Sequence, residues 1–170
     1  MKLTIQVGDD NTILRAISTE ITREELSAHL PTGEAMHKWL RAKSNGAGLA
    51  APQVGLNKRM IVVNMYKEES DGELHLTKTL LMINPKIIAR GSNIESDEEG
   101  CFSRPGMYGQ VLRAHEIEME YRDSRYLLKK MSLSGFNARV VQHEIDHLDG
   151  VLFTDKIQGK VLQPGRKAGI

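Results

Sequence analysis

The sequence predicts an α+β fold in which mixed or antiparallel sheets pack around a central helix bearing an HExxH motif. Candidate strands follow one another in runs through the middle of the chain and do not alternate with helices, which argues against a doubly wound parallel sheet. A helix-like segment from Gly135 to Leu148 follows the last of these strands and contains the motif. The 170 residues are enough for one domain with a sizeable core.

The composition is that of an ordinary globular protein, with 40% hydrophobic and 26% charged residues. The 23 basic and 22 acidic side chains give a net charge of +1, which does not favour nucleic-acid binding through a basic field. No apolar run approaches the length of a membrane span, and residues 1–10 lack the apolar core of a signal peptide. We therefore expect a cytoplasmic protein with neither a membrane nor a nucleic acid as a specific partner. Cys101 is the single cysteine, so an intrachain disulfide is excluded.

The N-terminal quarter is predicted to be an irregular segment followed by a helix. Residues 1–21 show no sustained period, whereas residues 22–43 have a helical pattern. Thr22 with Glu25 fits a capping box at the start of this pattern. Pro31 is expected to break or restart the helix, because proline has no N–H to donate.

The middle of the chain is predicted to form strands. A Gly-Ala-Gly sequence at residues 46–48 is read as a flexible loop before the first of them, and Asp71-Gly72 marks a hairpin turn. Pro85 should bend the chain between two strands, and HEIEMEY alternates as a half-exposed strand should. The predicted strands cover residues 59–65, 80–84, 86–90, 115–121 and 126–133.

The HExxH motif places His143 and His147 on one side of the predicted helix, about 40° apart at roughly 100° per residue. Both imidazoles can therefore reach one metal ion, and Glu144 can touch a water on that metal without being a ligand. The alternative is a chance match on a solvated helix face, and the motif alone does not decide between the two. The apolar neighbours Val140 and Ile145 favour a buried helix, in which unpartnered histidines and acids would be costly.

A third metal ligand is sought elsewhere, because a catalytic site of the zinc type usually has three protein ligands and one open position. Asp149 is too close in sequence to the motif to be a comfortable ligand, and Asp155 has no supporting pattern. Cys101 lies in the segment Glu99-Gly100-Cys101-Phe102-Ser103, beside a glycine that permits unusual backbone geometry. A thiolate is a strong ligand for a soft or borderline divalent metal, so Cys101 is the preferred candidate.

A second candidate element is the segment GAGLAAPQ at residues 46–53. Its small residues would let the backbone come close to a ligand, and Gln53 offers an amide donor that could stabilise an oxyanion. The alternative interpretation is a tight connection before a strand, and the segment alone does not exclude it.

Taken together, these three segments resemble the peptide deformylases, whose motifs are GxGLAAPQ, EGCxS and QHExDHLxG. They stand here as residues 46–53, 99–103 and 142–150, in the order and spacing of the family. The resemblance extends from about Ile21 to about Asp155. It implies an enzyme that removes the formyl group from N-formylmethionyl nascent chains and releases formate.

By this resemblance, Cys101, His143 and His147 bind one divalent metal ion, and Glu144 is the general base and acid. The ion in the cell would be Fe²⁺, with Zn²⁺, Ni²⁺ or Co²⁺ able to occupy the site. Residues 1–158 would form a single catalytic domain, and residues 159–170 a flexible tail.

The remaining site residues also follow from the resemblance. Gln53 and the backbone N–H of Phe102 would hold the oxyanion, and Glu99 would support the metal site through hydrogen bonds. The peptide would run extended along the small-residue segment, with an apolar pocket for its methionine. The residues expected to contact substrate are Gly46, Ala47, Gly48, Leu49 and Phe102.

This chain departs from the family pattern at several positions. Phe102 stands where leucine is most frequent, and Arg104 where an apolar residue is usual, so the cleft is expected to differ there. Nascent formylmethionyl peptides are the implied partners. A transient ribosome contact is left open, because the tail is short and contains Pro164 and Gly165 where many members have a longer basic helix.

Two rival functions are weighed against a deformylase. A zincin-like metallopeptidase needs a third ligand downstream of HExxH, and the Cys101 segment argues against it. A non-catalytic metal-binding descendant needs neither Glu144 nor Gln53, and the presence of both argues against that alternative.

Overall fold

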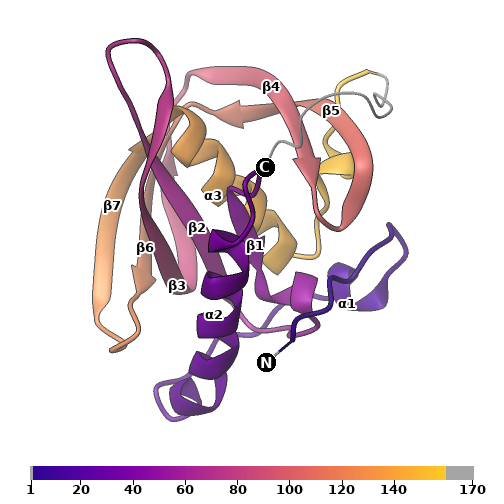
Figure 1. Ribbon diagram of the computed structural model, residues 1–170, viewed down its shortest axis with the longest axis vertical. Coiled ribbons are helices and arrows are strands. Elements are labelled where there is room, and N and C mark those ends of the chain that lie inside the picture. The colour runs from indigo at the N-terminus through magenta and orange to yellow at the C-terminus, as the bar shows by residue number, and fades with distance from the viewer. Residues whose placement is uncertain (1, 160–170) are drawn as a thin grey trace.

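The computed structural model describes residues 2–159, which form one five-stranded sheet, one two-stranded sheet and a long helix between them (Figure 1). The five-stranded sheet has the order β1-β2-β3-β6-β7, and β4 pairs with β5. All of these named strands pair in the antiparallel sense, so the predicted α+β class with antiparallel sheets is confirmed. The elements are α1 (Thr12–Arg15), α2 (Leu26–Arg41), β1 (Gly48–Ala50), η1 (Ala51–Val54), β2 (Met60–Glu68), β3 (Leu74–Arg90), β4 (Ile94–Cys101), β5 (Arg104–Ala114), β6 (Glu116–Arg122), β7 (Leu128–Ser134), α3 (Gly135–Leu148) and η2 (Phe153–Asp155).

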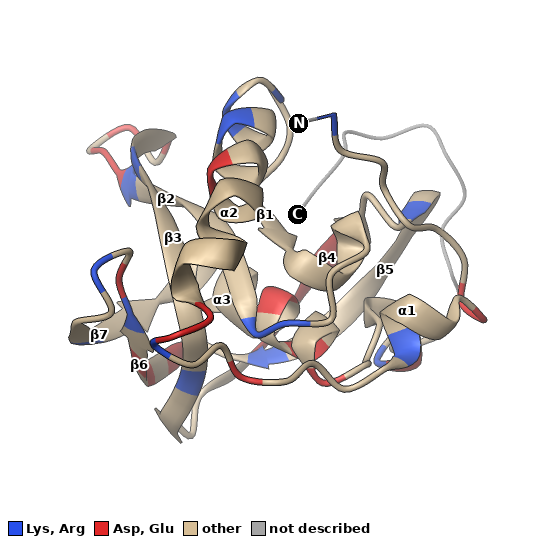
Figure 2. Cartoon of the chain, turned by 90° about the horizontal axis from the view of Figure 1, so that it is seen from below, with Lys and Arg blue, Asp and Glu red and all other residues tan. Residues whose placement is uncertain are grey.

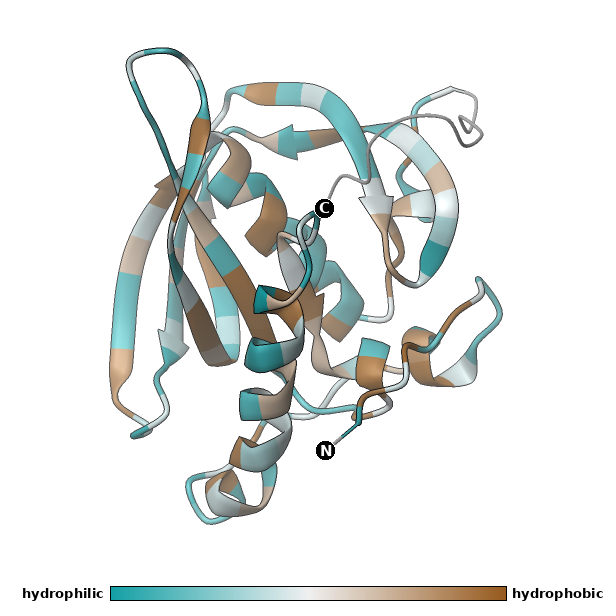
Figure 3. Ribbon diagram, viewed as in Figure 1, coloured by the Kyte–Doolittle hydropathy of each residue, from teal (hydrophilic) through white to brown (hydrophobic). Residues whose placement is uncertain are grey.

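The core lies on both faces of β2. Ile61 and Val63 pack towards α3, whereas Met60 and Val62 pack into a second apolar cluster that includes residues of α2. A strand covered on both faces reads as a continuous apolar run, which is why residues 59–65 were recognisable from the sequence. Figure 3 shows the hydrophobic residues gathered on the inner strands and on α3.

Helix α2 covers the face of the sheet opposite to α3. Thr22 and Glu25 exchange the two hydrogen bonds of the predicted capping box, at 3.0 and 3.3 Å, just before the helix begins. The predicted break at Pro31 is wrong, because α2 is continuous from Leu26 to Arg41. Pro31 lies early in the helix and removes a single backbone donor, while the buried side chains of Met36 and Leu40 hold the following turns against the sheet.

Several strand boundaries differ from those predicted. The strands expected on either side of Pro85 form one strand, β3, with a register shift beside Asn84, whose φ is 50°. The segment 46–48 is not wholly a loop, because Gly48 already belongs to β1. The β4–β5 hairpin was not predicted. Its inward-facing side chains include Glu99 and Arg113, which pair with each other, so the usual apolar alternation is missing.

Charged residues of both signs are distributed over the elements of the fold (Figure 2). Of the helices within residues 2–159, none is long and apolar enough to cross a membrane. Of the predicted C-terminal tail, residues 160–170 lie outside the described residues, so the expected flexibility is not tested.

The connection after α3 depends on a close backbone approach. Gly150 has a φ of +73°, and a Cβ built there would lie within 2.9 Å of the carbonyl carbon of Arg15. We expect Gly150→Ala to lower the free energy of unfolding by about 2–5 kcal/mol, measured by urea denaturation, from left-handed strain plus overpacking.

The matched control is Gly72→Ala. Gly72 also has a positive φ, +81°, but nothing lies within 4 Å of its added Cβ. This variant should lose about 1–2 kcal/mol, from the backbone strain alone. Equal losses in the two variants would show that the contact with Arg15 is unimportant.

Candidate metal centre

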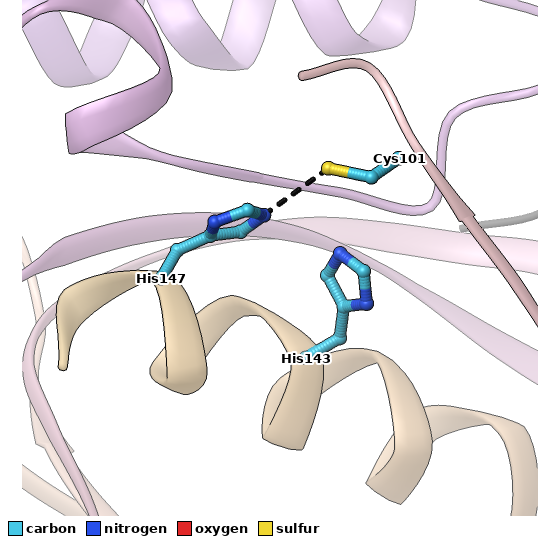
Figure 4. A group of neighbouring side chains, drawn as sticks. All are labelled: Cys101, His143 and His147. Carbon is cyan, nitrogen blue, oxygen red and sulfur yellow. Dashed lines mark hydrogen bonds between the residues drawn. The ribbon is translucent and has the colours of Figure 1, made fainter. Parts of the chain in front are cut away.

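Helix α3 presents two histidines side by side in the interior. His143 and His147 are one turn apart, with ring centroids separated by 5.0 Å, and both side chains are buried. Figure 4 shows both rings projecting from α3 towards Cys101. The apolar neighbours of the helix account for this burial, since Val140, Val141 and Leu148 pack in the core beside β1 and β2.

Cys101 approaches the histidines from the end of β4. The ladder with β5 shifts register between Gly100 and Cys101, so the strand ends in a tight connection that turns the thiol inward. The Cys101 Sγ lies 3.2 Å from the His147 Nε2. One ligand atom from each of Cys101, His143 and His147 lies within 4.8 Å of the others, so the three predicted ligands are brought together.

Glu99 connects this centre to the surrounding fold. Its side chain is fully buried and accepts hydrogen bonds from Arg113 at 2.9 and 2.9 Å, from Arg139 at 2.8 Å and from His143 Nδ1 at 2.9 Å. Burial alone would raise the pKa of Glu99, but the bonds from Arg113 and His143 hold this pKa far below its usual value. The carboxylate therefore fixes the His143 ring with its Nε2 free for a metal.

Asp146, which precedes His147 on α3, pairs with two cationic side chains. Its carboxylate is bound by Arg113 and by the Lys156 ammonium, at 2.7 Å, rather than by a histidine. Arg113 thus joins two acids, Glu99 and Asp146.

Glu144 directly follows His143 on α3 and is itself almost fully buried. Its Oε2 has no hydrogen-bond partner among the described residues. Burial is the main cause that raises the pKa of this carboxyl group to about 7. On the opposite side, a Cβ built on Gly48 would lie 2.6 Å from the Glu144 Cγ, so only glycine fits there. The acid can therefore exchange a proton near neutral pH in a space closed by β1.

Gln53 has a fixed orientation in η1. Its Oε1 accepts the Ala50 N–H at 2.8 Å, which leaves the Nε2 group directed at the Cys101 Sγ, 3.3 Å away, and the Ser103 Oγ, 3.2 Å away. The predicted donor thus faces the cysteine ligand.

The predicted substrate-contacting residues lie close to the centre but differ in what they expose. The side chain of Leu49 is fully buried in the apolar cluster with residues of α2, and its backbone pairs with Val62 of β2. Phe102 is half-buried, and its ring meets the edge of Trp39 at a centroid distance of 5.0 Å. Gly46 is confined beside that ring, because an added Cβ would lie 2.9 Å from the Phe102 Cζ.

Arg139 is a residue of the centre that the sequence analysis missed. It is buried, one turn before His143 on α3, and donates to Glu99 as well as to the Val111 and Glu95 carbonyls, both at 2.9 Å. The sequence did contain a signal for this role, namely an arginine on an otherwise apolar helix that also carries the two histidines. Its partners come from other strands and could not be assigned from the sequence.

The donors present fit a divalent metal ion. One sulfur and two imidazole nitrogens form a set that suits zinc and other borderline divalent ions. Burial holds the pKa of His147 well below its usual value, so this ring is neutral, as a metal ligand must be. Burial also acts to lower the pKa of His143, but the contacts with Cys101 and Glu99 outweigh it and raise this pKa to about 10, so a metal ion would displace a proton from that ring. The unpaired Oε2 of Glu144 is a buried acceptor that a metal-associated water would satisfy. Cys101, His143 and His147 could therefore hold one ion.

Comparisons with known proteins agree with this geometry. A family profile described as polypeptide deformylase matches residues 2–162. A peptide deformylase of Prochlorococcus marinus (strain MIT 9312) is 41% identical over 155 residues, which cover 91% of this chain and 73% of the relative.

Solved structures give the same result. The Met-Ala-Ser-bound class I type b peptide deformylase from Acinetobacter baumannii matches with a TM-score of 0.83 and 34% identity, covering 92% of this chain and 99% of that one. A probable peptide deformylase from Synechococcus phage S-SSM7 matches with a TM-score of 0.77 and 38% identity, covering 92% and 100%.

Metal content provides a test of the three donors. We expect the purified protein to bind one divalent ion per chain and Cys101→Ala to lose it on dialysis, measured by elemental analysis. Removing a donor should weaken binding by more than the roughly 10- to 100-fold that loss of a ligand's hydrogen-bond partner causes. His115→Ala is the control, because His115 pairs with the exposed Glu95 and should leave metal content unchanged. Full metal content in Cys101→Ala would remove the cysteine from the set.

Proposed function

This chain belongs to the polypeptide deformylase family, and from that premise we propose how its own residues remove the formyl group from N-formylmethionyl nascent polypeptides. The observation that carries the proposal is the buried Oε2 of Glu144, which is unpaired among the described residues and belongs to the residue after His143, one of the three grouped ligands. A structural metal site would need no such acid.

The proposed metal is a single divalent ion on Cys101, His143 and His147, with Fe²⁺ as the ion in the cell and Zn²⁺, Ni²⁺ or Co²⁺ as alternatives. When bound, such an ion supplies Lewis acidity, which acidifies water and polarises the formyl carbonyl. Glu99 supports the site by holding the His143 ring through its Nδ1.

Glu144 moves the proton in this mechanism. It accepts a proton from the attacking water as the new C–O bond forms at the formyl carbon. It then donates that proton to the peptide nitrogen as the C–N bond breaks, which yields formate and a free amino terminus. A pKa of about 7 suits both steps, because the group is neither too weak a base nor too weak an acid at neutral pH.

The developing negative charge needs donors that are already in place. We assign this role to the Nε2 group of Gln53 and to the backbone N–H of Phe102. The Ala50 N–H holds the Gln53 amide in the required orientation, so no reorganisation is needed during the reaction.

The peptide is proposed to bind as an added strand along β1. This strand is at the edge of the five-stranded sheet and, within residues 2–159, pairs only with β2. The Asn64 N–H donates to the Ala47 carbonyl, so by the alternation of an antiparallel ladder the N–H and carbonyl of Gly48 face the open edge. Backbone hydrogen bonds from such an edge are the usual means of binding an extended peptide. The Met-Ala-Ser in the Acinetobacter baumannii relative supports a peptide ligand.

The cellular setting remains a prediction. Nascent formylmethionyl chains emerge at cytoplasmic ribosomes, and we propose that compartment for this enzyme. We also propose a transient ribosome contact and a single catalytic domain over residues 1–158.

The deciding experiment measures formate release from formyl-Met-Ala-Ser by protein prepared without oxygen and loaded with Fe²⁺. Release that a chelator abolishes and added metal restores would support the proposal. A folded, metal-loaded protein that releases no formate would contradict it.

Replacement of Glu144 tests the proton transfer directly. Glu144→Gln keeps the shape of the side chain but cannot accept a proton, so kcat should fall by about 10²- to 10⁴-fold. Metal content and the unfolding midpoint should stay close to those of the unchanged protein. Near-normal turnover would exclude Glu144 as the general base.

A further inference from the structure

We propose that Asn64 is a positioning residue that fixes the Gly46–Gly48 edge for the part of a peptide that lies beyond its formylmethionine, with Thr79 orienting its amide. This inference rests on the proposed function. Asn64 belongs to β2, was not singled out by any sequence motif, and has only 3% of its surface exposed.

Asn64 binds two successive carbonyls before β1. Its side-chain Nδ2 donates to the Gly46 carbonyl at 2.8 Å, and its backbone N–H donates to the Ala47 carbonyl at 2.8 Å. A buried carbonyl without a donor would be costly, so these two bonds determine where the chain turns from the loop into the strand.

Thr79 holds the other end of the Asn64 amide. The Thr79 hydroxyl, on the neighbouring strand β3, donates to the Asn64 Oδ1 at 2.7 Å. The Gly46 carbonyl can only accept, so the Nδ2 side of the amide faces it and the Oδ1 side is left to the Thr79 hydroxyl. The position of the loop before β1 is thereby linked to β3, which is two strands away from β1 in the sheet.

The apolar side of the same loop is also closed. A Cβ on Gly46 would lie 2.9 Å from the Leu40 Cδ1 and 2.9 Å from the Phe102 Cζ. Gly46 is therefore held between these side chains and the Asn64 amide, and the phenylalanine that is unusual in this family forms one wall. Loss of the polar contact would free the carbonyl while leaving the walls intact.

The place of Gly46 determines which part of a substrate would be affected. Gly48 lies against Glu144, and the chain continues through η1 to Gln53, which reaches the Cys101 Sγ. The Gly46 end of the edge thus leads away from the metal ligands. A formyl group at the centre and an extended peptide on this edge place the residues after methionine beside Gly46 and Ala47.

The test compares a long and a short substrate. For Asn64→Ala we expect KM for formyl-Met-Ala-Ser to rise about tenfold, the equivalent of one well-placed hydrogen bond, with kcat within about twofold of the original. For formylmethionine amide, which does not reach Gly46, kcat/KM should change by less than about threefold, below the effect of one hydrogen bond. An equal loss on both substrates would overturn the positioning role.

Two further variants test the role of the threonine. Thr79→Val removes the hydroxyl at nearly constant volume and should give a smaller shift in the same direction, confined to the long substrate. Thr79→Ser retains the hydroxyl, so its KM for the long substrate should equal that of the unchanged protein. Thr79→Val also keeps the proposal testable if Asn64→Ala does not fold, and no substrate-length effect in that variant would contradict it.

Asn137→Ala is the matched control. Asn137 also binds the β2 backbone with both side-chain atoms, at Tyr66, at 2.8 and 2.9 Å, but it does not contact the Gly46–Gly48 edge. It should lose stability without changing the ratio of kcat/KM between the two substrates. If the unchanged protein releases formate from neither substrate, the proposed function fails. If it is active and Asn64→Ala behaves like Asn137→Ala, only the positioning role fails.

Discussion

A carboxylate with no exposed surface must be neutralised by its neighbours, and the arrangement of this protein's centre depends on how Glu99 meets that requirement. Its partners come from β5, through Arg113, and from α3, through Arg139 and His143. The β4–β5 hairpin and α3, which are distant in the chain, are thereby fixed relative to one another. Removing one of these partners would weaken the compensation of a buried charge, so these contacts favour a single arrangement of the hairpin on the helix.

This ion network and the chemistry of the site are physically linked. Cys101 follows Glu99 by two residues, so the contacts that hold the acid also bring the thiol to the histidines. Arg113 continues the network to Asp146 on α3, next to His147. Glu144 lies outside these pairings, buried with an unpaired oxygen, and its raised pKa depends on that isolation. The network thus fixes the ligands while leaving the proposed base free to exchange protons.

Prediction from the sequence succeeded where a local pattern has one dominant meaning. β2 was recognisable because burial on both faces makes it a continuous apolar run, and β6 because burial on one face imposes a period of two. The β4–β5 hairpin was missed because its interior contains paired charges, which resemble a solvated surface when read one strand at a time. The expected break at Pro31 failed because the packing of α2 against the sheet outweighs the loss of one backbone bond.

The sequence by itself determined that His143 and His147 would share a helix face, because helix geometry is local and acts over four residues. It also supplied Cys101 as a candidate through a motif that resembles a family. Only the tertiary structure decided that Glu99 accepts a hydrogen bond from Arg139, and that the Asn64 amide binds both the Gly46 carbonyl and the Thr79 hydroxyl. These are contacts between different elements of the fold. The partner of a buried polar side chain depends on burial and on three-dimensional geometry. The spacing of residues along the chain gives no information about either.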